Sequence, residues 1–221
     1  TVQRSQFCTM GAISDIFFIG NWNRFRAWML AIATAILGTQ ILHMQELVDL
    51  NESIYLSTNL NWAGAIIGGL MFGFGMTIGG GCGNKTLVRL GAGNMKSLVV
   101  AIVLGLFSYM TLRGLLGLAR VELEALTVID LAAFEMETQS ISEFLILLGV
   151  DARLARIICA TVLSGGLYLF CFKSSEFRQS KVDMASGIII GILIVAAWFV
   201  TGYIGFDDFE PTPLASFSFV A

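Results

Sequence analysis

The sequence carries little charge for its length, and this shortage excludes most soluble folds. Only 13% of the 221 residues are Asp, Glu, Lys or Arg, whereas soluble domains carry about twice that fraction. Hydrophobic residues make up 56% of the chain, and the mean hydropathy is +0.80. We therefore expect a polytopic membrane protein, and the net charge of −3 argues against a nucleic-acid-binding protein.

Proline and the residues that build metal sites are also scarce. The chain has two prolines and no Pro/Ser-rich or charged linker, so we predict a single transmembrane domain over residues 1–221. The four cysteines lack zinc-type CxxC spacing, and we expect no metal site. The chain contains no GK[ST] phosphate loop, paired catalytic carboxylates or nucleophile elbow, so no cofactor is predicted.

Five apolar segments are long enough to cross a bilayer as helices. They cover residues 27–43, 62–81, 97–119, 154–172 and 184–204. A shorter apolar segment, residues 10–19, ends at Gly20. We predict that it is a re-entrant half-helix; an amphipathic helix on the membrane surface is the alternative. The fold class is therefore all-α.

The segments that flank these spans alternate in the sign of their charge. The basic ones contain Arg24, residues 85–96 and residues 173–181. The acidic ones are residues 44–61, 122–151 and 207–210. Because Lys and Arg mark the cytoplasmic side, five crossings place the basic segments inside and the acidic segments outside. Arg120, Arg153 and Arg156 depart from this pattern, but each lies at a span end, where a long side chain reaches water.

The span at residues 62–81 is rich in glycine. Three small-xxx-small pairs occur in it: Gly64 with Gly68, Gly69 with Gly73, and Gly75 with Gly79. In lipid, this spacing allows a neighbouring backbone to approach closely. A cysteine, Cys82, follows directly after the triple glycine that ends the span.

Cys82 precedes a short predicted helix with Asn84 as its N-cap and Gly91 as its stop. The thiol therefore lies beside the positive end of a helix, which favours an anion. Cys8 has a similar setting, with Thr9 as a possible cap. Two thiols that each precede a short helix resemble the broken-helix sites of transporters. The candidate site residues are Cys8, Gly81, Cys82, Gly83, Asn84, Lys85 and Arg89.

Other interpretations of these residues remain open at this level. A buried cysteine is most often a small hydrophobe, and this applies to Cys82 as well. We interpret Cys159 and Cys171, in an ordinary span, as packing residues. Arg113 falls inside a predicted span, where a charge is costly: it either has a functional role or extends to the interface. His43 ends a span, has no ligand partner at metal spacing, and is predicted to be interfacial.

Three stretches of the sequence resemble the YeeE/YedE family of bacterial sulfur-transport membrane proteins. They are QRSQFCTMGAISD near the start, GGLMFGFGMTIGGGCGNKTLVRLGAGN, and the tail GFDDFEPTPLASFSFV. The resemblance implies a transporter, not an enzyme, with an internal-repeat fold in the inner membrane. It implies uptake of thiosulfate or a similar small sulfur anion. In this family, half-helices meet at the membrane centre and cysteine thiols relay the ion by S–H hydrogen bonds.

The resemblance also indicates what lies outside this sequence. Cys8 and Cys82 match two cysteine motifs of the family, but the third, in a second half-repeat, has no counterpart here. We therefore expect the native protein to continue beyond Ala221. The resemblance further suggests a cytoplasmic TusA-like or rhodanese-like sulfur carrier as partner.

Physical chemistry suits this assignment. Dehydrating a dianion requires fixed positive potential, which two helix N-termini with Lys85 or Arg89 would supply. A neutral thiol is a weak donor, whereas a thiolate would repel the ion, so we predict that both thiols act protonated. One alternative is a membrane thiol enzyme that forms a persulfide and passes sulfur to a carrier. Another is a non-transporting subunit that anchors such a carrier.

Overall fold

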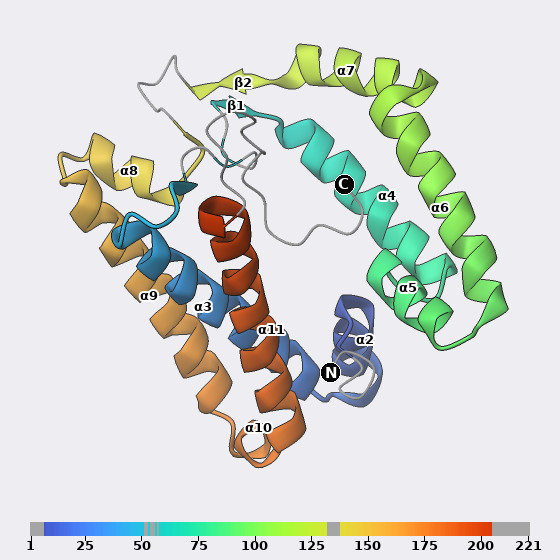
Figure 1. Ribbon diagram of the computed structural model, residues 1–221, viewed down its shortest axis with the longest axis horizontal. Coiled ribbons are helices and arrows are strands. Elements are labelled where there is room, and N and C mark those ends of the chain that lie inside the picture. The colour runs from blue at the N-terminus through green and yellow to red at the C-terminus, as the bar shows by residue number, and fades with distance from the viewer. Residues whose placement is uncertain (1–6, 51–52, 54–55, 57, 132–137, 205–221) are drawn as a thin grey trace.

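The computed structural model describes residues 7–50, 53, 56, 58–131 and 138–204 (Figure 1). Five helical stretches in it are long and apolar enough to cross a membrane. They are Asn23–Met44, Trp62–Gly91, Met95–Arg113, Ala152–Phe172 and Lys181–Ile204. Each matches one predicted span, so the predicted all-α, multi-pass membrane architecture is confirmed. The resembling tail, residues 205–220, and Glu52, Glu135 and Glu137 of the acidic segments lie outside the described residues.

The elements follow one another with short connections. In chain order they are α2 (Thr9–Ser14), η1 (Asp15–Ile19), α3 (Asn23–Met44), β1 (Asn59–Leu60), α4 (Trp62–Ile78), α5 (Gly83–Gly91), α6 (Met95–Arg113), α7 (Leu115–Thr127), β2 (Ile129–Asp130), α8 (Ile141–Leu147), α9 (Ala152–Phe172), α10 (Ser175–Gln179), α11 (Lys181–Phe199) and η4 (Val200–Ile204). Helices α8 and α10 lie where the sequence predicted only connecting segments, and α7 extends from the end of the predicted span 97–119 into the acidic segment that follows it.

Helices α3, α9 and α11 pack together as one bundle, on the left of Figure 1. Its core contains Leu30 of α3, Cys171 of α9 and Phe177 of α10, all fully buried. Glycines bring α11 close to α3: a Cβ added at Gly187 would lie 2.7 Å from the Ala27 carbonyl oxygen. The absence of a side chain at this position therefore permits the close helix crossing.

Helices α4 to α7 form a second group, on the right of Figure 1. Helix α5 packs on α6, and α7 packs on both α6 and α4. The predicted span 97–119 is wrong at its end, because α6 stops at Arg113 and α7 starts after Gly114. A Cβ at Gly114 would lie 2.8 Å from the Met110 carbonyl oxygen, so glycine permits this break. Arg113 consequently lies at a helix end and not within a span.

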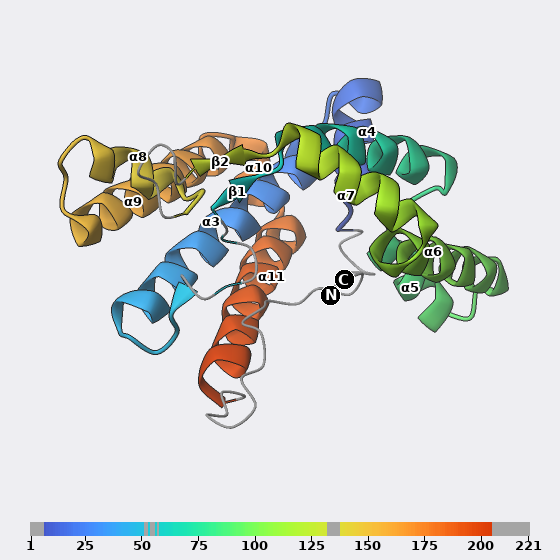
Figure 2. The same cartoon turned by 90° about the horizontal axis from the view of Figure 1, so that it is seen from above.

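Two contacts join segments that the charge pattern assigned to the same membrane side. Strand β1 pairs antiparallel with β2, Asn59 opposite Asp130, so two acidic segments meet at one end of the molecule. At the start of α3, the Asn23 side-chain amide donates to the Glu176 carboxylate of α10 at 3.1 Å. Figure 2, the view from above, shows β1 and β2 lying between the two helix groups.

Candidate functional site

Cys8 begins the short apolar helix that the sequence predicted. The helix runs over Thr9–Ile19, first as α2 and then as the π-helix η1. Cys8 itself, with extended backbone (φ −154°, ψ 128°), is the N-cap, so the suggested cap Thr9 is wrong by one residue. Gly20 ends the helix with a φ of 73°. Its predicted role as the stop is confirmed.

Cys82 holds the equivalent position in front of α5. Its backbone is extended (φ −74°, ψ 170°), and helix α5 starts at the buried Gly83. The Thr86 N–H donates to the Cys82 carbonyl at 3.0 Å and closes the first turn. The predicted N-cap, Asn84, is therefore wrong by two residues. This side chain is exposed inside the first turn.

The end of α5 agrees only in part with the prediction. Gly91 is the last helical residue, and Gly93, with a φ of 86°, has the left-handed backbone that follows the helix. Only glycine adopts this conformation without steric cost. The helix therefore ends at Gly91 as predicted, but the left-handed glycine that follows it is Gly93, and α6 starts directly after Asn94.

The fold brings the two thiols together although they are 74 positions apart in the chain. The Cys8 and Cys82 side chains are neighbours that interact with each other. The N–H groups of Met10 and Gly11 lie near the Cys8 sulfur, and those of Asn84 and Lys85 near the Cys82 sulfur. None of these amides completes a geometrically ideal hydrogen bond to its sulfur. Two sets of backbone donors thus surround one pair of thiols.

Lys85 and Arg89 follow Cys82 on one side of α5, but their side chains have different neighbours. Lys85 lies near enough to act electrostatically on Cys8, and its side chain packs on Gly81, where an added Cβ would lie 2.7 Å from Lys85 Cδ. Arg89 Nη1 donates to the Gly80 carbonyl at 3.2 Å. Lys85 is therefore the cation beside the thiols, and Arg89 braces the glycine turn between α4 and α5.

A second cation lies on the Cys8 side, where sequence reasoning had identified it only as a basic residue before the first span. Arg24, in the first turn of α3, forms an ion pair with Asp15 at 3.2 Å. A Cβ at Gly11 would lie 3.0 Å from Arg24 Nη1. Glycine at this position therefore leaves room for the guanidinium beside the helix that Cys8 starts.

The arrangement can bind an anion but offers no metal site. Backbone N–H groups at two helix starts, with a nearby ammonium, provide positive potential beside the thiols. Among the described residues, no group of three His, Cys, Asp or Glu side chains could hold a metal ion. Cys8 is buried and Cys82 half-buried, so an anion between them would be largely shielded from water.

The other cysteines lie elsewhere. Cys171 is fully buried in the α3–α9–α11 core, and its thiol donates to the Arg26 carbonyl at 3.2 Å. Its interpretation as a packing residue fits this position. Cys159 is half-buried on α9.

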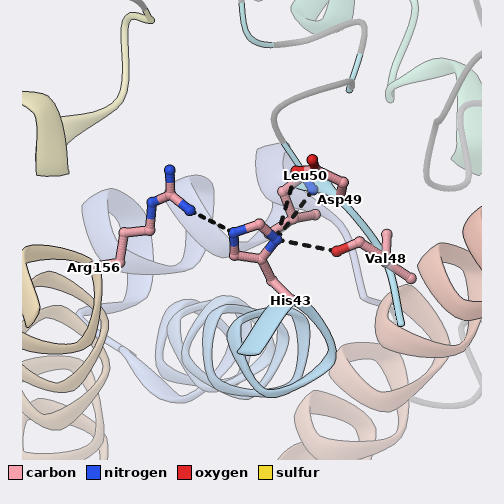
Figure 3. Close-up of polar contacts among 5 residues, drawn as sticks. All are labelled: His43, Val48, Asp49, Leu50 and Arg156. Atoms are coloured by element: carbon pink, nitrogen blue, oxygen red, sulfur yellow. Dashed lines mark hydrogen bonds and ion pairs between the residues drawn. The ribbon is translucent and has the colours of Figure 1, made fainter. Parts of the chain in front are cut away.

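A polar junction that sequence reasoning missed joins α3 to α9 (Figure 3). Arg156 Nη1 lies 2.6 Å from His43 Nε2. Because a guanidinium only donates, Nε2 accepts from Arg156, and Nδ1 lies 3.1 Å from the Val48 carbonyl oxygen. The Leu50 N–H and the Asp49 carboxylate also face Nδ1, at 3.3 and 3.8 Å. No spacing in the sequence connects His43 with a residue 113 positions away.

Comparison with known proteins finds similarity to sulfur transport proteins. The family described as "Sulphur transport" matches residues 4–220, nearly the whole chain. The chain is 32% identical over 111 residues to the thiosulfate transporter TsuA of Escherichia coli K12, a match that covers 50% of this chain and 29% of that protein.

Two further relatives agree with this result. A thiosulfate transporter TsuA from Spirochaeta thermophila is 29% identical over 113 residues, covering 51% of this chain and 33% of that protein. The probable transporter YedE of Escherichia coli K12 is 29% identical over 90 residues, covering 40% and 20%. The matched stretch thus spans a third or less of each relative's length. All three are named as transporters and none as an enzyme.

Proposed function

From the premise that this chain belongs to the sulphur transport family, we propose that it forms part of a membrane path for thiosulfate or a similar small sulfur anion. The observation that carries the proposal is the meeting of the Cys8 and Cys82 thiols. Each begins a short helix, and the backbone donors of both helices converge on the pair. The names of the relatives support a sulfur oxyanion as cargo.

The chemistry of the thiols suits transient binding. A protonated thiol donates a weak hydrogen bond, so an ion can bind at one thiol and leave for the next. The fixed N–H dipoles and Lys85 offset part of the cost of removing water from a dianion. In this proposal both cysteines act as hydrogen-bond donors, the short helices enter the membrane as re-entrant segments, and Arg89 supports the path through Gly80.

The proposal also gives the chain an orientation. We place it in the bacterial inner membrane with Lys85, Arg89 and Lys96 on the cytoplasmic side and the paired strands β1 and β2 outside. The basic cytoplasmic surface would then meet a TusA-like or rhodanese-like sulfur carrier. The pairing of Asn59 with Asp130 supports one common side for the two acidic segments.

Uptake of radiolabelled thiosulfate by cells that express the full-length protein tests the proposal. Cys8→Ala and Cys82→Ala remove the donors and should abolish most uptake, whereas Ser at either position, which keeps a donor, should retain part of it. Cys159→Ala is the matched control, because it makes the same chemical change away from the thiol pair. Wild-type uptake by Cys82→Ala at equal protein level would refute the relay.

The rival enzyme hypothesis predicts a different product at the same thiols. If Cys82 were a nucleophile, exposure to thiosulfate would leave a covalent persulfide on it. Mass spectrometry of the purified protein after such exposure should find both thiols unmodified. A persulfide on Cys8 or Cys82 would favour the sulfur-transfer reaction over transport.

A further inference from the structure

The two cysteine helices are built on the same plan. Each starts at a cysteine with extended backbone, Cys8 or Cys82, and each buries the residue four positions later. These buried residues are Ala12 and Thr86. In each case the short helix leads through a left-handed glycine to a long span, α3 or α6.

The turns that lead into the spans share one hydrogen bond, although α3 starts two residues after its asparagine and α6 starts one residue after its own. In the first, the Asn21 side-chain oxygen accepts from the Asn23 N–H at 2.8 Å. In the second, the Asn94 side-chain oxygen accepts from the Lys96 N–H at 3.0 Å. Each asparagine directly follows the left-handed glycine and bonds two positions ahead. The two turns therefore share this bond, although Asn94 is itself the N-cap of α6 and the N-cap of α3 is Trp22.

The second unit ends its short helix with an ordinary glycine cap. The Gly93 N–H donates to the Leu90 carbonyl at 2.9 Å, and the Asn94 N–H donates to the Arg89 carbonyl at 3.0 Å. These bonds span three and five positions, which is the Schellman pattern.

The first unit contains one more residue, and the extra residue lies in η1. The Gly20 N–H donates to the Ile16 carbonyl at 3.2 Å, and the Asn21 N–H donates to the Asp15 carbonyl at 3.1 Å. These bonds span four and six positions, one more than the corresponding bonds of the second unit. Correspondingly, twelve positions separate Cys8 from Gly20 but eleven separate Cys82 from Gly93. A single inserted residue in a helix is accommodated as a π-turn, and η1 is that turn.

Asp15, the first residue of η1, forms the ion pair with Arg24 at 3.2 Å, but the two phenylalanines at the centre of the π-turn make no comparable contact in the described part of the protein. Phe17 and Phe18 are 81% and 87% exposed, so neither packs into the described part of the protein. The insertion changes the angle and the distance along the helix axis between Cys8 and the Gly20–Asn21 turn. One residue corresponds to about 100° of rotation and about 1.5 Å of rise along a helix. At Phe17 and Phe18, the number of residues therefore matters more than their identity.

We propose that the extra residue in η1 is a positioning element that rotates the Cys8 helix about its Gly20–Asn21 turn until the Cys8 thiol meets the Cys82 thiol. Without it, both cysteines would stand at the same angle to the glycine–asparagine turns that follow their short helices. The effect of this register on transport rests on the proposed function, but the effect on the distance between the thiols does not.

Deleting Phe17 in the full-length protein tests the register, with Phe17→Ala as the matched control that keeps the residue count. Membranes are oxidised with copper phenanthroline, and the Cys8–Cys82 disulfide is quantified by mass spectrometry. Because a disulfide forms only between closely facing Cβ atoms, wild type and Phe17→Ala should crosslink and the deletion should not. Equal crosslinking of the deletion variant would overturn the proposal.

A second pair of variants keeps the test decisive if the deletion variant is not produced. Asn21→Leu removes the bond to the Asn23 N–H, while Asn21→Asp keeps the acceptor. Crosslinking should fall in the first variant and return in the second; wild-type crosslinking of Asn21→Leu would contradict the proposal. Thiosulfate uptake measured on the same variants separates the register proposal from the proposed transport function. If crosslinking follows the expected pattern but uptake does not depend on the cysteines, the register proposal is supported and the transport function is refuted.

Discussion

Two glycine-lined helix faces, one on α11 and one on α4, carry the same sequence signal and have different environments. On α11, a Cβ at Gly187 or Gly191 would lie 2.7 Å from the Ala27 carbonyl or 2.9 Å from the Ala31 carbonyl of α3. On α4, no atom of a neighbouring segment in the described part of the chain lies within 4 Å of such a Cβ at four positions. They are Gly68, Gly69, Gly73 and Gly75.

The difference shows that small-xxx-small spacing permits close approach but does not choose the partner. The α11 span has 22% of its most apolar window buried, and the α4 span has none. Beside the α4 glycines, an apolar groove against α6 is lined by Met71, Phe72, Val103 and Phe107. Stability should therefore depend on the glycines of α11 much more than on those of α4.

The largest expected effect comes from placing leucine into the close contact. Gly191→Leu has no room against the Ala31 carbonyl and the Thr34 side chain, and we expect a loss of about 3 kcal/mol from overpacking. Thermal aggregation of the detergent-purified full-length protein measures it. Gly73→Leu is the matched control, and its midpoint should remain near that of wild type. Similar shifts for both variants would mean that the α4 face is covered in the native protein.

A smaller effect is expected at the other end of the α3–α9–α11 bundle. Arg156→Leu leaves His43 Nε2 without the guanidinium donor, and the loss of such a bond costs about 1–2 kcal/mol. The same aggregation assay should report a lower midpoint for Arg156→Leu than for Arg153→Leu. Arg153 is exposed one turn earlier on α9, so its replacement controls for the lost charge. Equal midpoints would show that the junction adds nothing to the bundle.

The smallest effect should differ in sign between the two faces. Gly69→Ala adds a methyl group in open space, and the lower chain entropy of alanine should stabilise α4 by about 0.5–1 kcal/mol. Gly187→Ala adds the same methyl group against a backbone oxygen and should destabilise the protein. A comparison of the two midpoints checks this reversal. Stabilisation by both substitutions would contradict the tight α3–α11 crossing.

The spans were predictable because apolar length is a property of the local sequence. All five were located, and so was the short apolar helix that ends at Gly20. The break at Gly114 was missed because leucines continue on both sides of it, and glycine within an apolar run does not by itself end a helix. The short helices α8 and α10 were missed because polar residues interrupt their apolar patterns.

That each of the two thiols precedes a short helix was predictable from the sequence, but the details of those helix starts were not. Cys8 and Cys82 were identified because each precedes a helix start, and the fold brings them together. The caps were shifted, because the cysteines themselves adopt the extended backbone that Thr9 and Asn84 were expected to take. Arg24 was not identified as a site residue, since its approach to Gly11 depends on how α3 turns back along α2.

Local sequence alone determined that this chain is a multi-pass helical membrane protein with two thiols at helix starts, because hydrophobic length and cap chemistry act over a few residues. Tertiary structure decided which glycine face is buried, that His43 meets Arg156, and that Cys8 faces Cys82. These outcomes depend on how segments far apart in the chain pack, and on the rotation of a helix by a single residue, which no local pattern specifies.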